Sequence, residues 1–507
     1  MLAERLFAIQ GALQSSQAVP KMIQYGGWEP DRAALGSAGC VTATNVRPSA
    51  DGFRPIPGLS TQSDALTARC QGATAGRDTD GAVSYYAGDA TKLYRLAGST
   101  WSDVSKGGGY ATAADDNWEY TQFGSTILAT NLADAVQGAT IGSGSFTDHI
   151  TSSDKPKARH IDIVRDFVVL GNTNDATDGA KPSRVWWGAI NSSVDFTPAA
   201  ATQCDFQDLP DGGWVQRVVG GAEYGLIFQE TMIRRMTYVG TPLVFQIDPI
   251  DRARGTPIPN SVIGYGRLVF FISDDGFYMT DGVSSTPIGD EKVDRTFWNN
   301  FAIAYKDRVS AAIDPISKLV MWAFPSTSAS LPDTVYIFHW PSQKWATLSA
   351  NLEVLFRALA KGYTLDGLDA VSATLDALAF SLDSRAWTGQ NVKLAAFNQS
   401  HILNFFDGPN LAATIDTGDV QLNPFGLATV NNLRPLVDGG TVTMQVAGRT
   451  RPQDTVTYGS AATIDTDGKC SILNTARYHR FRQNIPAASS WSHAQGVQVS
   501  YSDAGNQ

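Results

Sequence analysis

The chain has 507 residues, more than one ordinary hydrophobic core supports, so we expect at least two structural units. Glycine occurs 47 times and only 17% of the residues are charged, which favours an all-β protein with many turns. No stretch of 18 apolar residues exists, so we expect no stable membrane insertion. The net charge of −10, without a long basic run, argues against a protein that grips nucleic-acid phosphates, but not against a conduit through which DNA slides.

The N-terminal segment is a poor match to a secretory signal, because Glu4 and Arg5 precede an interrupted apolar stretch. If this segment is a helix, its apolar residues lie on one face. These residues are Leu2, Leu6, Ile9 and Leu13. This spacing predicts a short amphipathic helix that docks on a neighbour. We expect residues 1–60 to form this helix and an arm that joins a platform domain.

A pattern of four strands recurs six times between residues 61 and 350. Each repeat has a polar strand, a tight turn, a strongly apolar strand, a third strand rich in aromatic or β-branched residues, and a short closing strand, which in the third repeat is residues 194–198. The apolar strands are AVSYYAG, STILATN, FVVLGN, EYGLIFQ, RLVFFIS and KLVMWAF. A period of about 40 to 50 residues with four strands is typical of a β-propeller, whose blades close into a ring. The sequence therefore predicts an all-β fold with a six-bladed β-propeller over residues 61–350.

Residues 351–507 alternate apolar and polar side chains in TVTMQVAG and GVQVSYS, which predicts strands. Because closing a propeller brings its first and last strands together, we expect the N- and C-terminal segments to build one β-rich platform domain. The segment ARYHRFR, if it is a strand, places Tyr478, Arg480 and Arg482 on one face. Arg477, Arg480 and Arg482 are our candidates for a subunit interface or for a constriction that holds a DNA end.

Motifs for catalysis, metals or cofactors are not found. The six histidines are at least 11 residues apart, so no pair has the spacing of zinc ligands on a helix. The chain also lacks a nucleophile elbow, a Walker phosphate loop and a dinucleotide-binding glycine motif. We therefore predict no catalytic, metal-binding or cofactor-binding residue and no enzymatic activity. Four cysteines without a C-x-x-C pair are expected to be small buried side chains, and they are Cys40, Cys70, Cys204 and Cys470.

An acidic sequence within FISDDGFYMTDG is similar to the Asp-box hairpin of sialidase propellers, but the spacing fails and no Trp closes it. Asp274, Asp275 and Gly276 instead favour a two-residue hairpin that uses a positive φ angle.

Two segments carry a likeness to a known family. Residues 27–59 contain a W-x-P-D sequence followed by N-x-x-P and a G-F-x-x-x-P-G entry, in which the matching positions are Trp28, Pro30, Asp31, Asn45, Pro48, Gly52, Phe53, Pro57 and Gly58. Residues 266–297 read as a hairpin before a short helix, which we expect Asp290 to cap, with one apolar face made of Val293, Phe297 and Phe301. Together these segments resemble the tail nozzle (packaged-DNA stabilisation, tail tubular) proteins of short-tailed bacteriophages.

The resemblance implies a structural virion protein that is assembled in the host cytoplasm and located in the virion tail. It implies a ring of copies, a hexamer in this family, bound to an adaptor ring below the portal and to tail fibre or needle and plug proteins. Such a ring extends the tail tube, retains the packaged genome and conducts double-stranded DNA during ejection, without sequence-specific binding.

Two other functions remain open from the sequence. A carbohydrate-active propeller enzyme, similar to a capsule depolymerase, would need a pair of carboxylates about 5 to 10 Å apart on blade loops. A monomeric ligand-binding propeller would need neither a ring nor a reaction.

Overall fold

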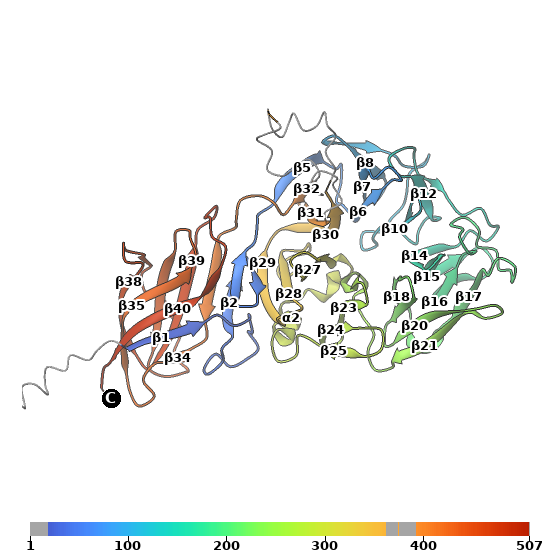
Figure 1. Ribbon diagram of the computed structural model, residues 1–507. Helices are drawn as coiled ribbons and strands as arrows, with labels where there is room; N and C mark the ends of the chain where they lie inside the picture. The colour runs from blue at the N-terminus through green and yellow to red at the C-terminus, as the bar shows by residue number, and fades with distance from the viewer. Residues whose placement is uncertain (1–18, 361–373, 375–391, 506–507) are drawn as a thin grey trace, which may run out of the picture.

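The computed structural model describes residues 19–360, 374 and 392–505. These residues form a ring of four-stranded sheets beside a β-sandwich that contains both ends of the described chain (Figure 1). The predicted all-β propeller fold is confirmed. No helix in this part of the chain is long and apolar enough to cross a membrane. The predicted N-terminal helix lies outside the described residues, which begin with β1 (Val19–Gln24).

The first three blades are antiparallel sheets whose strands follow the order of the chain, with the first strand next to the ring axis. Their strands are β6 (Gly72–Arg77), β7 (Val83–Gly88), β8 (Leu93–Ala97) and β9 (Thr100–Asp103), then β10 (Glu119–Phe123), β11 (Thr126–Thr130), β12 (Gln137–Thr140) and β13 (Thr147–Asp148), then β14 (Lys157–Val164), β15 (Phe167–Asp175), β16 (Gly179–Trp187) and β17 (Asp205–Asp208). The prediction that residues 194–198 close the third blade is wrong, because β17 lies ten residues further along the chain and pairs with β16.

Blades four to six repeat this arrangement. Their strands are β18 (Val215–Val219), β19 (Tyr224–Gln229), β20 (Ile233–Gly240) and β21 (Val244–Asp251), then β22 (Ile263–Tyr265), β23 (Leu268–Ser273), β24 (Gly276–Thr280) and β25 (Ser285–Pro287), then β26 (Ser310–Asp314), β27 (Leu319–Phe324), β28 (Thr334–His339) and β29 (Lys344–Ser349). The predicted two-residue hairpin is confirmed, because Ser273 pairs with Gly276 and leaves Asp274 and Asp275 as its loop. Gly276 has a φ of 144°, which favours glycine at this position.

The prediction of six blades is wrong, because the described residues contain a seventh. This blade combines β30 (Leu352–Leu359), β31 (Val392–Asn398) and β32 (Ile402–Phe405) with β5 (Ser60–Ala65), which pairs with β32 from a position before the first blade. The propeller therefore extends to Phe405, and the expected domain boundary at residue 350 falls between blades six and seven. Pairing of an early strand with a late one closes the ring by hydrogen bonds.

The remaining strands form a sandwich from both terminal segments, as predicted for the platform domain. One sheet has β3 (Val46–Ser49), β4 (Gly52–Pro55), β40 (Ala494–Asp503), β35 (Ala428–Val437) and β38 (Cys470–Ala476), with β1 beside β40. The other has β2 (Cys40–Thr44), β33 (Ala413–Thr417), β39 (Tyr478–Ile485), β36 (Thr443–Arg449) and β37 (Ala462–Thr463), with β34 (Val420–Gln421) beside β39. Alternating buried residues of β39 and β40 fill the space between the sheets.

Propeller and sandwich share a sheet and a core. Thr44 of β2 pairs with Thr347 of β29 in parallel, so the sixth blade continues into the sandwich as one ten-stranded sheet. One cluster of buried apolar residues spans the sandwich and blades five and six. All four cysteines are buried and none forms a disulfide, as expected for small apolar side chains. The two domains therefore pack as one body.

Candidate functional site

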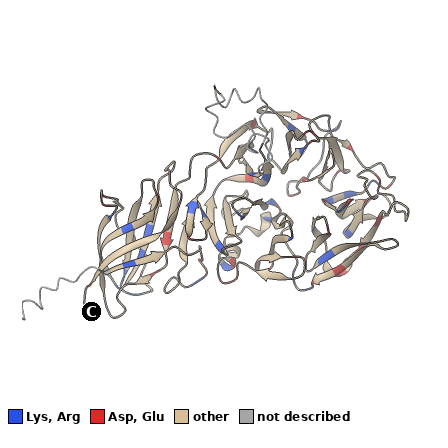
Figure 2. Ribbon diagram, in the orientation of Figure 1, with Lys and Arg blue, Asp and Glu red and all other residues tan. Residues whose placement is uncertain are grey.

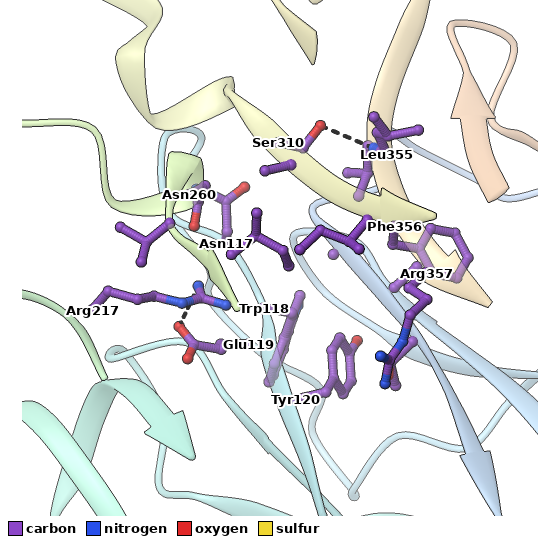
Figure 3. A pocket seen from close by; sticks show the side chains of 18 of the residues that line it. Asn117, Trp118, Glu119, Tyr120, Arg217, Asn260, Ser310, Leu355, Phe356 and Arg357 are labelled. Atoms are coloured by element: carbon purple, nitrogen blue, oxygen red, sulfur yellow. Dashed lines mark hydrogen bonds and ion pairs between the residues drawn. The ribbon is translucent and has the colours of Figure 1, made fainter. Parts of the chain in front are cut away.

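The propeller axis holds a cavity of about 450 Å³ (Figure 3). Its wall comes from the first strand of each blade and from the residues just before that strand. The first strands are β6, β10, β14, β18, β22, β26 and β30. Neighbouring first strands converge near the axis, so polar side chains on them can bond to the next blade. The cavity is therefore where residues distant in sequence meet.

Glu119 of β10 links three consecutive blades. Its Oε2 atom accepts from Arg217 Nη1 of β18 at 2.9 Å and from His160 Nδ1 of β14 at 2.9 Å, while Oε1 accepts from the backbone N–H of Ile161 at 3.2 Å. Burial would raise the pKa of Glu119, but Arg217 and His160 outweigh it and hold that pKa below its usual range. Burial lowers the pKa of His160, so the neutral imidazole donates to an ionised carboxylate.

Two further acids join neighbouring blades. Asp162 of β14 accepts from the backbone N–H of Gly220 at 2.7 Å, and burial raises its pKa. Glu353 of β30 accepts from the N–H of Cys70 at 2.9 Å and from His401 Nδ1 at 2.6 Å, and burial raises its pKa as well. Each carboxylate thus ties its own blade to backbone of the next one around the ring. These hydrogen bonds hold adjacent blades of the propeller together.

One end of the cavity is covered by the short helix η3 (Ile303–Arg308), which precedes blade six. Asn117, just before β10, and Asn260, just before β22, both donate from Nδ2 to the backbone oxygen of Asp307, at 2.7 and 2.9 Å. Arg159 of β14 also contacts Asp307, with 3.4 Å between Nη2 and Oδ1. Blades two and five lie on opposite sides of a seven-bladed ring, so Asp307 bridges the axis and closes this end.

A pair of carboxylates lies at the covered end. Asp116 and Asp307 contact the same Arg159 Nη2 atom, at 3.1 and 3.4 Å. Burial raises the pKa of Asp116, and Arg159 opposes that rise. Two close carboxylates in different environments are what the carbohydrate-active alternative requires. Here both carboxylates contact one guanidinium group, which holds η3 on blade three.

The arm before the propeller caps the helix after blade five. In helix α2 (Asp294–Asn300), the backbone N–H groups of Arg295 and Thr296 donate to the Asp31 carboxylate at 2.8 and 3.0 Å, and Thr296 Oγ1 donates to it at 2.6 Å. The prediction that Asp290 caps this helix is wrong, because the acceptor comes from Asp31, 264 residues away from Arg295. The predicted apolar face is confirmed by the buried side chains of Val293, Phe297 and Phe301.

Other residues of the arm also join the two domains. The Trp28 ring packs edge-on against Tyr336 of blade six, with centroids 4.8 Å apart. Asn45, at a φ of 60°, donates from Nδ2 to Ala412 O at 2.9 Å and accepts at Oδ1 from Ser349 N–H at 3.0 Å. The two segments that carry the family resemblance therefore form one joint between sandwich and propeller.

A groove of about 850 Å³ lies between the arm and α2. Acidic residues dominate its wall, including Asp275, Asp290, Glu291 and Asp294. Burial, reinforced by Asp290, Asp31 and Asp275, raises the pKa of Asp294 to about 7. Among the described residues, no three His, Cys, Asp or Glu side chains are placed to hold a metal ion.

The three candidate arginines lie in the sandwich, not at the propeller axis. Arg480 Nε contacts Asp419 Oδ1 at 3.0 Å, and Arg482 donates to both oxygens of Asp416 at 2.8 and 2.7 Å. Arg477 precedes β39, and its backbone N–H donates to Arg449 O. The predicted alternation is confirmed, since the intervening side chains His479 and Phe481 are buried. The acidic partners of Arg480 and Arg482 belong to this same chain, and basic residues are scattered over both domains (Figure 2).

The propeller class rests on the sheet topology, and the comparisons with known proteins add no argument to it. No known family profile matches the chain, and no curated protein matches it. Among solved structures, the extracellular domain of BT4673 from B. thetaiotaomicron is 8% identical, with a TM-score of 0.42, and the match covers 83% of this chain and 48% of that one. BBS1N in complex with ARL6DN is 9% identical, with a TM-score of 0.39 and coverage of 69% and 96%. The Pan2 WD40 domain of Neurospora crassa is 6% identical, with a TM-score of 0.38 and coverage of 71% and 96%.

The acidic residues in the wall of the cavity were not predicted from the sequence. Glu119, Asp162 and Glu353 are single acids between apolar residues, in NWEYT, HIDIV and NLEVL. A lone acid in the first strand of several repeats is the signal that points to them, because inner strands have little contact with solvent.

Proposed function

We propose that the chain is a structural subunit of the tail nozzle of a short-tailed bacteriophage. Copies form a ring, a hexamer in that family, that extends the tail tube, contacts an adaptor ring and fibre or needle proteins, retains packaged DNA and conducts it during ejection. The subunit is assembled in the host cytoplasm and acts in the virion tail.

The arm joint is the observation that carries this proposal. Asp31 and Trp28 come from one segment of the resemblance, and Asp31 caps the helix that ends the other. The shared sheet through Thr44 and Thr347 adds a second connection between the domains. A tail subunit whose propeller must keep a fixed orientation relative to the sandwich benefits from such a rigid connection, because a flexible linker would let the propeller rotate freely.

The sandwich offers a surface for assembly. Phe425 and Leu473 are both 81% exposed, Leu473 in β38 and Phe425 in the turn before β35. Among the strands that the structure describes, β38 pairs only with β35, so its other edge is free to bond. Exposed apolar side chains beside an unpaired edge favour a contact between copies.

Sedimentation velocity and negative-stain imaging of the full chain test the proposal. We expect rings with a central hole from the unaltered chain, and mostly monomers from the double variant Phe425→Ser, Leu473→Ser. Leu243→Ser is the matched control, since Leu243 is 67% exposed on a propeller hairpin. Monomers from the unaltered chain at high concentration would contradict the proposal, and a reducing-sugar assay with host polysaccharide would then test the enzymatic alternative.

The wall that faces DNA is expected to be acidic or neutral. Each phosphate neutralised by Lys or Arg releases counterions, so a basic wall would trap the DNA that must pass. Assembled rings titrated with short duplex DNA at about 50 mM salt should bind weakly. Tight binding with a steep salt dependence would show that the ring grips DNA instead.

A further inference from the structure

The cavity at the propeller axis is bridged at one end. Asp307 covers one end, held by Asn117 and Asn260 from opposite blades. On β30, Glu353 is buried beside the covered end, whereas Arg357, four residues further along, is exposed. The cavity therefore meets solvent on the side of Arg357, from which a ligand can enter.

The charged side chains in the cavity wall have an ion-pair or hydrogen-bond partner among the described residues, except Arg357. Glu119 pairs with Arg217, and Arg308 pairs with Asp115 at 3.2 Å. Asp162 and Glu353 accept from backbone N–H groups. The Arg357 side chain makes no hydrogen bond or ion pair within the residues that the structure describes, and it lines the cavity (Figure 3). Arg357 is thus the charged side chain of this wall that is left without a partner among the described residues, and its guanidinium group can bind a negatively charged group.

Three further polar atoms around the same cavity have no hydrogen-bond partner among the described residues. Asn117 and Asn260 use only their Nδ2 atoms, so both amide oxygens can accept hydrogen bonds from a ligand. The Tyr120 hydroxyl is buried without a partner. A buried polar group without a partner costs free energy that a bound hydroxyl group can recover. These groups together suit a molecule with several hydroxyl groups.

We propose that the channel binds an acidic disaccharide unit, with the carboxylate of a uronic acid on Arg357 and hydroxyl groups on Asn117, Asn260 and Tyr120. A carboxylate forms two parallel hydrogen bonds with a guanidinium group, which gives both affinity and orientation. A cavity of about 450 Å³ lies within the usual range for small-molecule sites. This site is independent of ring assembly and DNA passage.

Two disaccharides that differ only in one carboxylate test the proposal on the full chain. Cellobiuronic acid should bind, by calorimetry and saturation-transfer NMR, at least about tenfold more tightly than cellobiose, because a charge-assisted hydrogen bond is added. Arg357→Gln should remove this difference and leave the thermal unfolding midpoint unchanged. Arg434→Gln, an exposed arginine on the sandwich, is the matched control and should retain it.

Other outcomes would overturn the proposal. Equal affinity for the two disaccharides, no binding of either at about 10 mM, or unchanged binding by Arg357→Gln would each do so. If acetate competes as well as cellobiuronic acid, the hydroxyl contacts are wrong. A tetrasaccharide that ends in the same acidic unit distinguishes two sources of the ligand. If it binds more tightly than the disaccharide, the ligand is part of a glycan chain. If it binds more weakly, the ligand is a free sugar acid.

Discussion

Replacing Asp31 with alanine should release the joint between the arm and α2. Its side chain is only 4% exposed and accepts two backbone N–H groups and one hydroxyl group. Loss of a helix cap costs about 1 to 2 kcal/mol, and the orphaned Thr296 hydroxyl adds about 1 kcal/mol. The Arg295 ion pair adds little, because that side chain is 70% exposed. We therefore expect about 2 kcal/mol of local destabilisation.

Hydrogen exchange of residues 294–300 measures this loss directly. Because about 1.4 kcal/mol corresponds to a factor of ten, exchange should accelerate about 30-fold in Asp31→Ala. Asp31→Asn keeps one acceptor oxygen and should lose about half as much. Asp51→Ala is the control, an exposed aspartate in the turn between β3 and β4. If Asp31→Ala and Asp51→Ala exchange equally fast, the cap does not hold this helix and the reasoning fails.

Three further substitutions test other parts of the molecule. Burial raises the pKa of Asp294 to about 7. The stabilisation of the folded state by the proton on Asp294 is therefore complete below about pH 4 and is lost as the pH rises to about 7. Asp294→Asn should raise the melting temperature near pH 8 and reduce the fall of the melting temperature between about pH 4 and pH 8. Glu119→Gln leaves Arg217 without its anion and should cost about 2 kcal/mol by urea unfolding, and a cost below about 0.5 kcal/mol would show that this joint is unimportant. Arg482→Ala strands the buried Asp416 carboxylate and should cost about 3 kcal/mol, whereas a loss of ring assembly without a loss of stability would indicate a subunit contact instead.

The strands of the propeller were predictable where they are buried on both faces. β23 and β27 are apolar at nearly every position, and β15 is apolar over its first four residues, because these strands lie between blades and inside a sheet. The seventh blade was missed because its strands are separated in sequence. Residues 360–391 interrupt it between β30 and β31, and β5 comes from the other end of the propeller. A search for consecutive repeats finds neither feature.

The candidate site depends on contacts between distant residues, which local patterns do not record. Glu119 and Arg217 are 98 residues apart, and Asp31 is 264 residues from the helix residue Arg295 that it caps. Asp290, four residues before α2, was the natural local choice for a cap. The fold placed a different carboxylate there, because the segment between β1 and β2 packs on the residues after blade five, where the N–H of Asp31 donates to Lys292 O.

The chain enters and leaves the propeller through one narrow neck. The N–H of Gly58 donates to Pro409 O at 2.8 Å, and the N–H of Gly408 donates to Gly58 O at 3.0 Å. The propeller is therefore an insertion in a sandwich that is otherwise continuous in space, and its two ends are already side by side. Exchange of the whole ring for another would require matching this neck, the Asp31 cap, the edge of β29 and the core that the sandwich shares with blades five and six, while blades one to four would be free to differ.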